Sequence, residues 1–161
     1  MWTDCNGTEV EIGIAEKPEA LSAVFALRML VFVEEQLVPA EEELDAYDVT
    51  AIHFMVRLRT APTGEPPHIV ATARLVDKGN GVGKVGRVAV MAENRRQGLG
   101  AALMRYIADY AGKMGIRRLE LEAQCYAIPF YEKLGYVAEG EVFLDANIEH
   151  RRMWMLLHGG D

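Results

Sequence analysis

The chain has 161 residues, of which 50% are hydrophobic, so we expect a single domain with a full core over residues 1–161. Its formal net charge of −7 argues against nucleic acid or an anionic membrane surface as partners, because both favour basic patches. No leader peptide and no membrane-spanning run is expected, and both cysteines suit reduced thiols, which together suggest a cytoplasmic protein. Histidines and cysteines do not cluster at metal-ligand spacing, so no metal is expected.

The first segments predict a strand followed by a helix. Charged and apolar residues alternate over 9–15, which is typical of an edge strand. Apolar residues then recur at helical spacing over 19–32, and Pro18 fits the first turn of this helix.

An acidic run over 41–48 follows the first helix and fits either a short helix or a loop. We expect most of its carboxylates to be solvated. Arg28 is expected to form a structural pair with Asp45 or Asp48.

Three apolar segments joined by turn-rich stretches predict an antiparallel meander: 51–60, 68–77 and 82–91. In the first of these strands, alternate apolar positions face one side of the sheet, whereas His53 and Arg57 face the other. The Pro- and Gly-containing segment 60–67 is expected to be a hairpin loop, and 77–81 a turn.

The second half predicts the remaining elements: a helix over 99–114, a strand over 117–123, a short helix over 127–134, and a closing hairpin of 136–144 and 149–157. A strand, a crossover helix and a strand imply that 82–91 and 117–123 are parallel neighbours. The order β-α-(α)-βββ-α-β-α-ββ therefore predicts an α+β fold, with helices packed on a mixed sheet.

The segment 95–101, Arg-Arg-Gln-Gly-Leu-Gly-Ala, joins a strand to a helix and has the features of a phosphate-binding loop. The first turn of a helix has free N–H groups and a positive dipole end, and the glycines let a phosphate approach the backbone. The two arginines add charge-assisted donors. The alternative is an ordinary helix start with solvated arginines. Neither the P-loop nor the dinucleotide fingerprint fits this spacing, because Ala101, Ala102 and Leu103 occupy their diagnostic positions.

The pattern Arg95-x-x-Gly98-x-Gly100 resembles the pyrophosphate loop of the GNAT (GCN5-related) N-acetyltransferases. The segment 130–136, Phe-Tyr-Glu-Lys-Leu-Gly-Tyr, resembles another GNAT motif, and with the element order the resemblance covers nearly the whole chain. Further segments resemble the ElaA/YjcF-like subgroup: Arg28-x-x-Val31-Phe32-Val33-x-Glu35-Gln36, Asp48-x-x-Ala51-x-His53, Ala123-Gln124-x-Tyr126 and Ile148-Glu149-His150. Glu149 departs from the subgroup, whose members often carry Pro there.

The resemblance implies the GNAT acyl-CoA N-acyltransferase fold, with acetyl-CoA in a V-shaped gap between the strands 85–91 and 117–123. It implies cofactor contacts from the following residues: Val88, Ala89 and Val90 to the pantetheine arm; Arg95, Arg96, Gln97, Gly98, Leu99, Gly100 and Ala101 around the pyrophosphate; and Phe130 and Tyr131 beside the thiol.

Acetyl transfer also needs a proton for the departing thiolate and a neutral amine. The resemblance favours Tyr131 as the proton donor, and the alternative is a tyrosine that only packs. Several side chains are candidates for the base or for acceptor contacts, unless a water relay replaces them: His53, His150, Glu34, Glu35 and Glu122.

The resemblance thus implies an acetyl-CoA-dependent N-acetyltransferase, an acyltransferase in which an amine attacks acetyl-CoA directly. The acceptor is a small molecule or a protein amino group that the sequence does not identify, and a homodimer is possible. A non-catalytic acyl-CoA-binding or regulatory module is an alternative. An acyl-homoserine-lactone-synthase-like enzyme is a third, suggested by Arg28 and Phe32 but opposed by the well-formed loop 95–101.

Overall fold

The computed structural model describes residues 2–5, 7–59 and 68–158. Its strands are β1 (Thr3–Cys5), β2 (Thr8–Ile14), β3 (Ile52–Leu58), β4 (His68–Gly79), β5 (Val82–Val90), β6 (Arg118–Gln124), β7 (Val137–Asp145) and β8 (Ile148–Leu156). Its helices are α1 (Pro18–Arg28), the π-helix η1 (Met29–Glu35), α2 (Ala40–Glu43), α3 (Tyr47–Thr50), the 3₁₀ turns η2 (Ala92–Asn94) and η3 (Cys125–Ala127), α4 (Leu99–Lys113) and α5 (Ile128–Lys133).

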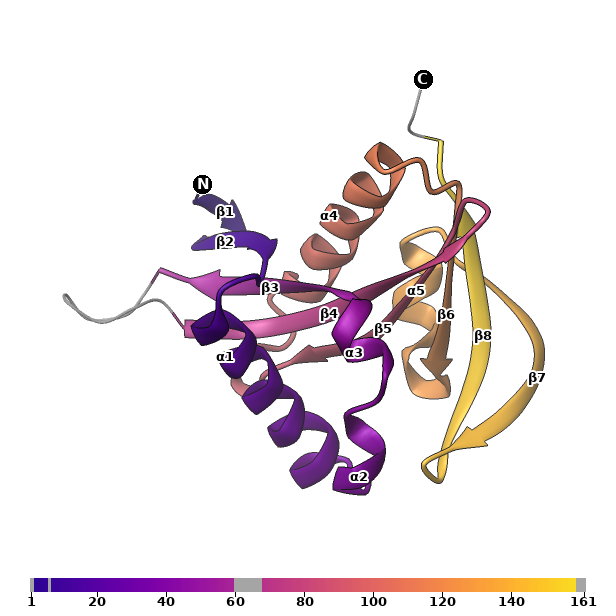
Figure 1. The fold of residues 1–161 in the computed structure, drawn as a ribbon, viewed down its shortest axis with the longest axis horizontal. Helices are drawn as coiled ribbons and strands as arrows, with labels where there is room; N and C mark the ends of the chain where they lie inside the picture. The colour runs from indigo at the N-terminus through magenta and orange to yellow at the C-terminus, as the bar shows by residue number, and fades with distance from the viewer. Residues whose placement is uncertain (1, 6, 60–67, 159–161) are drawn as a thin grey trace.

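The described strands form one mixed sheet in the order β1-β2-β3-β4-β5-β6-β8-β7 (Figure 1). β5 and β6 are parallel and all other neighbours are antiparallel, which confirms the predicted α+β class, the meander and the strand–helix–strand unit. The predicted hairpin loop over 60–67 lies outside the described residues.

Helices α1 and α4 cover opposite faces of the sheet (Figure 1). The alternation along β3 decides which side chain faces which helix. Phe54 is fully buried against Tyr106 and Tyr110 of α4. Met55 packs in the cluster of α1, and His53 stacks edge-on against Phe25 of α1.

Two boundaries differ from the sequence prediction. β2 is not an edge strand, because the three-residue β1 pairs along it from Thr3 to Cys5. The predicted helix over 19–32 changes at Met29 into the π-helix η1, which keeps Val31 and Phe32 buried. The wider π turn ends at Gln36, whose N–H donates to the Val31 carbonyl.

The acidic segment is also less solvated than expected. It forms the short helices α2 and α3, and within it Glu43 is 1% exposed. Arg28 binds Asp48 with an Nη1–Oδ1 distance of 2.7 Å, which confirms one of the two predicted pairs. Asp45 instead binds Arg74 at 2.7 Å. The side chains of Glu43 and Asp48 are buried against arginines of α1 and β4, whereas Glu41 and Glu42 are exposed as expected.

Candidate functional site

The parallel strands β5 and β6 are paired only at their beginnings. Their register runs from Val82–Arg118 to Val85–Leu121 and then stops, although both strands continue. Antiparallel neighbours β4 and β8 hold the outer edges of the two strands. The two strand ends therefore diverge and leave unpaired backbone groups on the edges that face the gap.

A β-bulge in β5 begins where the divergence begins. The pairing with β4 steps from Arg74–Gly86 to Thr72–Ala89, so three residue steps on β5 match two on β4. Beyond the bulge, the Met91 N–H donates to the β4 strand at 2.8 Å. Along a strand, the N–H and C=O groups of successive residues point to alternate sides. Those of Val88 and Val90 therefore point towards the gap, whereas those of Ala89 point towards β4.

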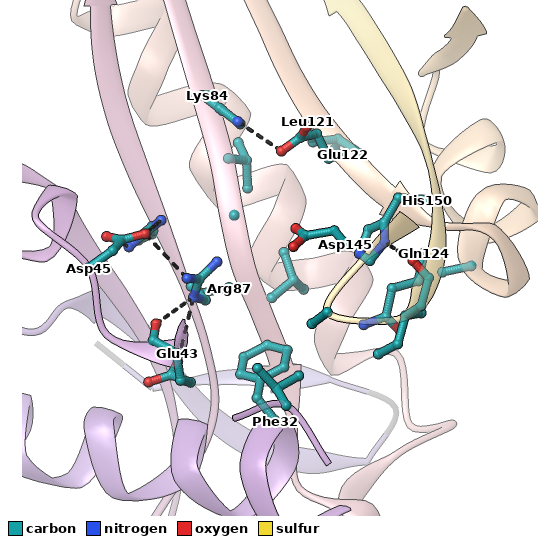
Figure 2. A pocket seen from close by; sticks show the side chains of 18 of the residues that line it. Phe32, Glu43, Asp45, Lys84, Arg87, Leu121, Glu122, Gln124, Asp145 and His150 are labelled. Carbon is teal, nitrogen blue, oxygen red and sulfur yellow. Dashed lines mark hydrogen bonds and ion pairs between the residues drawn. The ribbon is translucent and has the colours of Figure 1, made fainter. Parts of the chain in front are cut away.

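A cavity of about 430 Å³ opens at the gap (Figure 2). Val88 of β5, Leu121 of β6 and Tyr131 of α5 line it. In Figure 2, Arg87, Glu43 and Asp45 lie on one side of the cavity, and Gln124, Asp145 and His150 lie on the other.

His150 enters the cavity from β8 in a fixed tautomer. It is 9% exposed and stacks on Phe143, with ring centroids 5.8 Å apart. Its Nδ1 lies 2.7 Å from the Ile148 carbonyl oxygen, which can only accept, so Nδ1 carries the proton. In the neutral ring the lone pair is then on Nε2.

Tyr131 lines the same cavity from α5 and is 8% exposed. Its ring packs edge-on against Phe130 and Tyr136. Burial, with a smaller contribution from Tyr126, raises the pKa of Tyr131, so its phenol keeps the proton at neutral pH. Such a phenol suits hydrogen-bond donation, and its raised pKa lies further from the pKa of a thiol than that of an ordinary tyrosine does.

The loop 95–101 leads directly into α4. Gly98 is the N-cap with a φ of +80°, and no side chain caps the first turn of the helix. The N–H groups of this turn are therefore available to an anion. A Cβ built on Gly100 would lie 3.4 Å from the Phe130 ring and 3.7 Å from Val90, so the helix start, α5 and the end of β5 meet here. The loop does not line the cavity but lies beyond its β5 end.

The two arginines of the loop differ in their surroundings. Arg95 donates Nε to the Val90 carbonyl at 2.9 Å and holds Glu35 through two hydrogen bonds of 2.6 and 2.8 Å. This pairing lowers the pKa of Glu35. Arg96 is exposed, with a φ of +64°, and makes no hydrogen bond or ion pair with the described residues. Arg96 is therefore the freer cation for a ligand.

The remaining candidates for the base lie in different places. Glu122 lines the cavity and pairs with Lys84 at 2.9 Å. Glu35 and His53 do not line it. His53 was expected on a polar face, but it is 5% exposed beneath α1, with Nε2 3.0 Å from the Asp48 carbonyl oxygen.

Two features near the cavity were missed from the sequence. Arg87, at the bulge, binds the acidic segment that forms one wall. Gln124 of β6 donates to Gln36 at the end of η1, at 2.8 Å. The sequence held one signal for the contact between Gln124 and Gln36: both glutamines belong to segments that resemble the ElaA/YjcF-like subgroup.

Among the described residues, no helix is long and apolar enough to cross a membrane. In the same part of the chain, no group of three or more His, Cys, Asp or Glu side chains is placed to hold a metal ion.

The mixed sheet, the diverging parallel pair and the uncapped helix start define an acyl-CoA N-acyltransferase fold. The model of the acetyltransferase (GNAT) domain matches residues 65–157. YjcF of Bacillus subtilis, described as an uncharacterized N-acetyltransferase, is 38% identical over 141 residues, which cover 87% of this chain and 95% of that protein. The chain belongs to the GNAT acetyltransferase family.

Solved structures agree with this assignment. An acyl-CoA N-acyltransferase from Pseudomonas aeruginosa is 29% identical, with a TM-score of 0.75 over 92% of this chain and 99% of that one. ElaA of Escherichia coli shares the fold at 24% identity, with a TM-score of 0.77 over 91% of this chain and 99% of that one. The family implies acyl-CoA-dependent acyl transfer.

Proposed function

We propose that the protein transfers the acetyl group of acetyl-CoA to an amine by direct attack. The observation that carries the proposal is the opening of β5 and β6 onto a cavity that Val88 and Tyr131 share, beside the uncapped start of α4. A peptide-like pantetheine arm can bind the backbone groups of Val88 and the N–H of Val90, whose carbonyl already accepts from Arg95. The N–H groups of 97–101 and the charge of Arg96 suit the pyrophosphate, with Arg95 holding the loop to β5.

The reaction balances without any further reactant. The amine nitrogen attacks the thioester carbonyl carbon, a C–N bond forms, the C–S bond breaks, and CoA leaves as a thiolate. The amine loses one proton and the thiolate gains one. A backbone N–H that hydrogen-bonds the carbonyl oxygen stabilises the charge that develops there during attack.

We assign the two proton-handling roles to side chains that line the cavity. His150 is our candidate for the base, because its fixed tautomer leaves the Nε2 lone pair for the amine proton. Tyr131 is our candidate for the donor to the thiolate sulfur. Its raised pKa favours a strong hydrogen bond from a retained proton over complete proton transfer.

The experiment that tests the proposal has two steps. Binding of acetyl-CoA is measured by calorimetry, and release of CoA thiol is then measured across a panel of amines, polyamines, amino acids and peptides. Thiol release with a matching acetylated product supports the enzyme. Binding with no thiol release from any amine supports the non-catalytic acyl-CoA-binding module. Absence of binding refutes both.

A further inference from the structure

Arg87 adopts a backbone conformation that is unusual for a residue with a side chain. Its φ of +53° lies in the left-handed region that favours glycine, and such a conformation persists only where the surroundings hold it. Arg87 follows the last pair between β5 and β6, Val85–Leu121, by two residues. The strained residue therefore lies where the two sides of the gap part, directly before Val88.

The side chain of Arg87 reaches across to the end of α2. Its Nε donates to the Glu43 carbonyl at 3.0 Å, and its Nη2 donates to the Glu42 carbonyl at 3.3 Å and to Asp45 Oδ2 at 3.2 Å. The last carbonyl groups of a helix have no partner within it, and Arg87 donates hydrogen bonds to those of α2. The guanidinium thus holds the cavity wall that contains Glu42, Glu43 and Asp45 to the bulge of β5.

The other two arginines of this cluster bind mainly carboxylates. Arg28 and Arg74 hold the side chains of Glu43, Asp45 and Asp48 through short contacts, and Arg28 also donates to the Glu43 carbonyl at 3.0 Å. Two of the three hydrogen bonds that Arg87 donates go instead to backbone carbonyls. The acidic segment is therefore anchored from beneath without Arg87, and the contacts of Arg87 chiefly fix the relative position of two backbones.

We propose that Arg87 is a positioning residue for acetyl transfer, which holds the bulge so that the Val88 N–H faces the thioester carbonyl. This inference rests on the proposed function. A hydrogen bond in the reaction must point at the carbonyl oxygen before the amine attacks, and a bulge free to relax to negative φ would redirect that N–H. The same contacts hold the cavity wall formed by 42–45 against the same bulge.

The test compares Arg87→Gly and Arg87→Lys with the parent protein. Glycine adopts the positive φ without strain but removes all three hydrogen bonds and the ion pair with Glu43, whereas lysine keeps one cationic donor group and loses the planar fork. Acetyl-CoA labelled with ¹³C at the thioester carbonyl is bound to each protein, and the carbonyl stretching frequency is measured by difference infrared spectroscopy. This readout needs no acceptor and reports the hydrogen bond directly.

We expect the parent to lower the carbonyl frequency relative to free acetyl-CoA, and Arg87→Gly to lose most of this shift. Arg87→Lys should keep an intermediate shift. The dissociation constant for acetyl-CoA should change by only a few-fold, because Arg87 makes no contact with the loop 95–101. With an acceptor identified, kcat should fall about 10²-fold in Arg87→Gly, which is the usual cost of losing one such donor.

Asn80→Gly is the matched control, because Asn80 also has a positive φ of +56° but lies in the turn between β4 and β5. It should leave the carbonyl frequency at the parent value. If the carbonyl frequency in acetyl-CoA-bound Arg87→Gly equals that of the parent, the inference is wrong. If Arg87→Gly does not fold, an unchanged frequency in Arg87→Lys overturns the inference instead. If the parent itself does not bind acetyl-CoA, the proposed function is also wrong, and this result differs from one in which the parent binds and only the inference fails.

Discussion

The buried charge cluster beneath the acidic segment gives a strong prediction about stability. Asp48 accepts hydrogen bonds from Arg28 at 2.7 and 3.1 Å, from Arg74 at 2.9 Å and from the Asp45 N–H at 3.0 Å. Arg28 is 1% exposed and the Asp48 side chain 9%. Replacing Asp48 by Asn keeps the shape of the side chain but leaves a buried guanidinium with one charged partner fewer.

Loss of one partner from a buried ion pair costs about 3–5 kcal/mol of unfolding free energy. For a chain of 161 residues this corresponds to a decrease in Tm of roughly 6–20 °C. We expect Asp48→Asn to show this loss in urea unfolding at pH 7 and in a thermal melt. A loss below about 1 kcal/mol would refute the reasoning, because that is what an exposed pair contributes.

The matched control is Asp109→Asn, which removes an acid from the exposed i,i+4 pair with Lys113. Its effect should stay below about 0.5 kcal/mol. The pH dependence supplies a second check. Burial favours the neutral form of Asp48, but hydrogen bonds from Arg28, the Asp45 N–H and Arg74, together with the charge of Arg28, outweigh it and lower the pKa of Asp48 below its ordinary value. A lowered folded-state pKa stabilises the fold above the unfolded value of about 3.9, and this contribution is lost as the pH falls. The difference between parent and Asp48→Asn should therefore shrink below about pH 4.

Three further predictions concern the proposed acetyl-CoA site. Acetyl-CoA at about 100 times its Kd should stabilise the parent by roughly 2.7 kcal/mol. Gly100→Val should abolish this shift, because its Cβ would already touch Phe130 and Val90 and the further methyl groups would displace the helix start whose N–H groups suit the pyrophosphate. A parent melting temperature that acetyl-CoA does not change would contradict the site. Arg96→Ala should weaken acetyl-CoA binding and reduce its salt dependence with little change in kcat, and a collapse of kcat at constant affinity would show a chemical role instead. In steady-state kinetics, Tyr131→Phe should lower kcat about 10²-fold and change the KM for acetyl-CoA by no more than a few-fold. An unchanged kcat would show that Tyr131 only packs and does not donate the proton.

The local patterns in the sequence predict most of the architecture. Apolar residues alternate along β3 and β4 and recur at helical spacing before and after the loop 95–101. These strong signals predicted the order of the elements and the parallel pair of strands. A strand–helix–strand unit fixes which two strands are neighbours, whereas the gap between them was expected only from the GNAT resemblance. The three-residue β1 has no such signal, since a segment this short becomes a strand only by pairing with β2.

The buried charges could not be predicted from the sequence for a different reason. Glu43 and Asp48 look like members of a solvated acidic run, and only the tertiary positions of Arg28 and Arg74 bury them. The conformation of Arg87 gives no local signal either, because neither Gly nor Asn marks the positive φ at that position. His53 alternates with apolar neighbours as a surface residue would, and it is buried because α1 covers that face of β3.

The contacts at the end of η1 determine which loop arginine gives a clear test of phosphate binding. Glu35 holds Arg95, which follows β5, and the next residue, Gln36, holds Gln124 at the end of β6. Two consecutive residues therefore touch both sides of the gap, and one of them lines the cavity. A change at Arg95 removes a charge near the loop and also frees the turn that carries Gln36. An effect of Arg95→Ala on the binding of both substrates would follow from this geometry alone. Of the two loop arginines, only Arg96 therefore separates phosphate binding from the shape of the cavity.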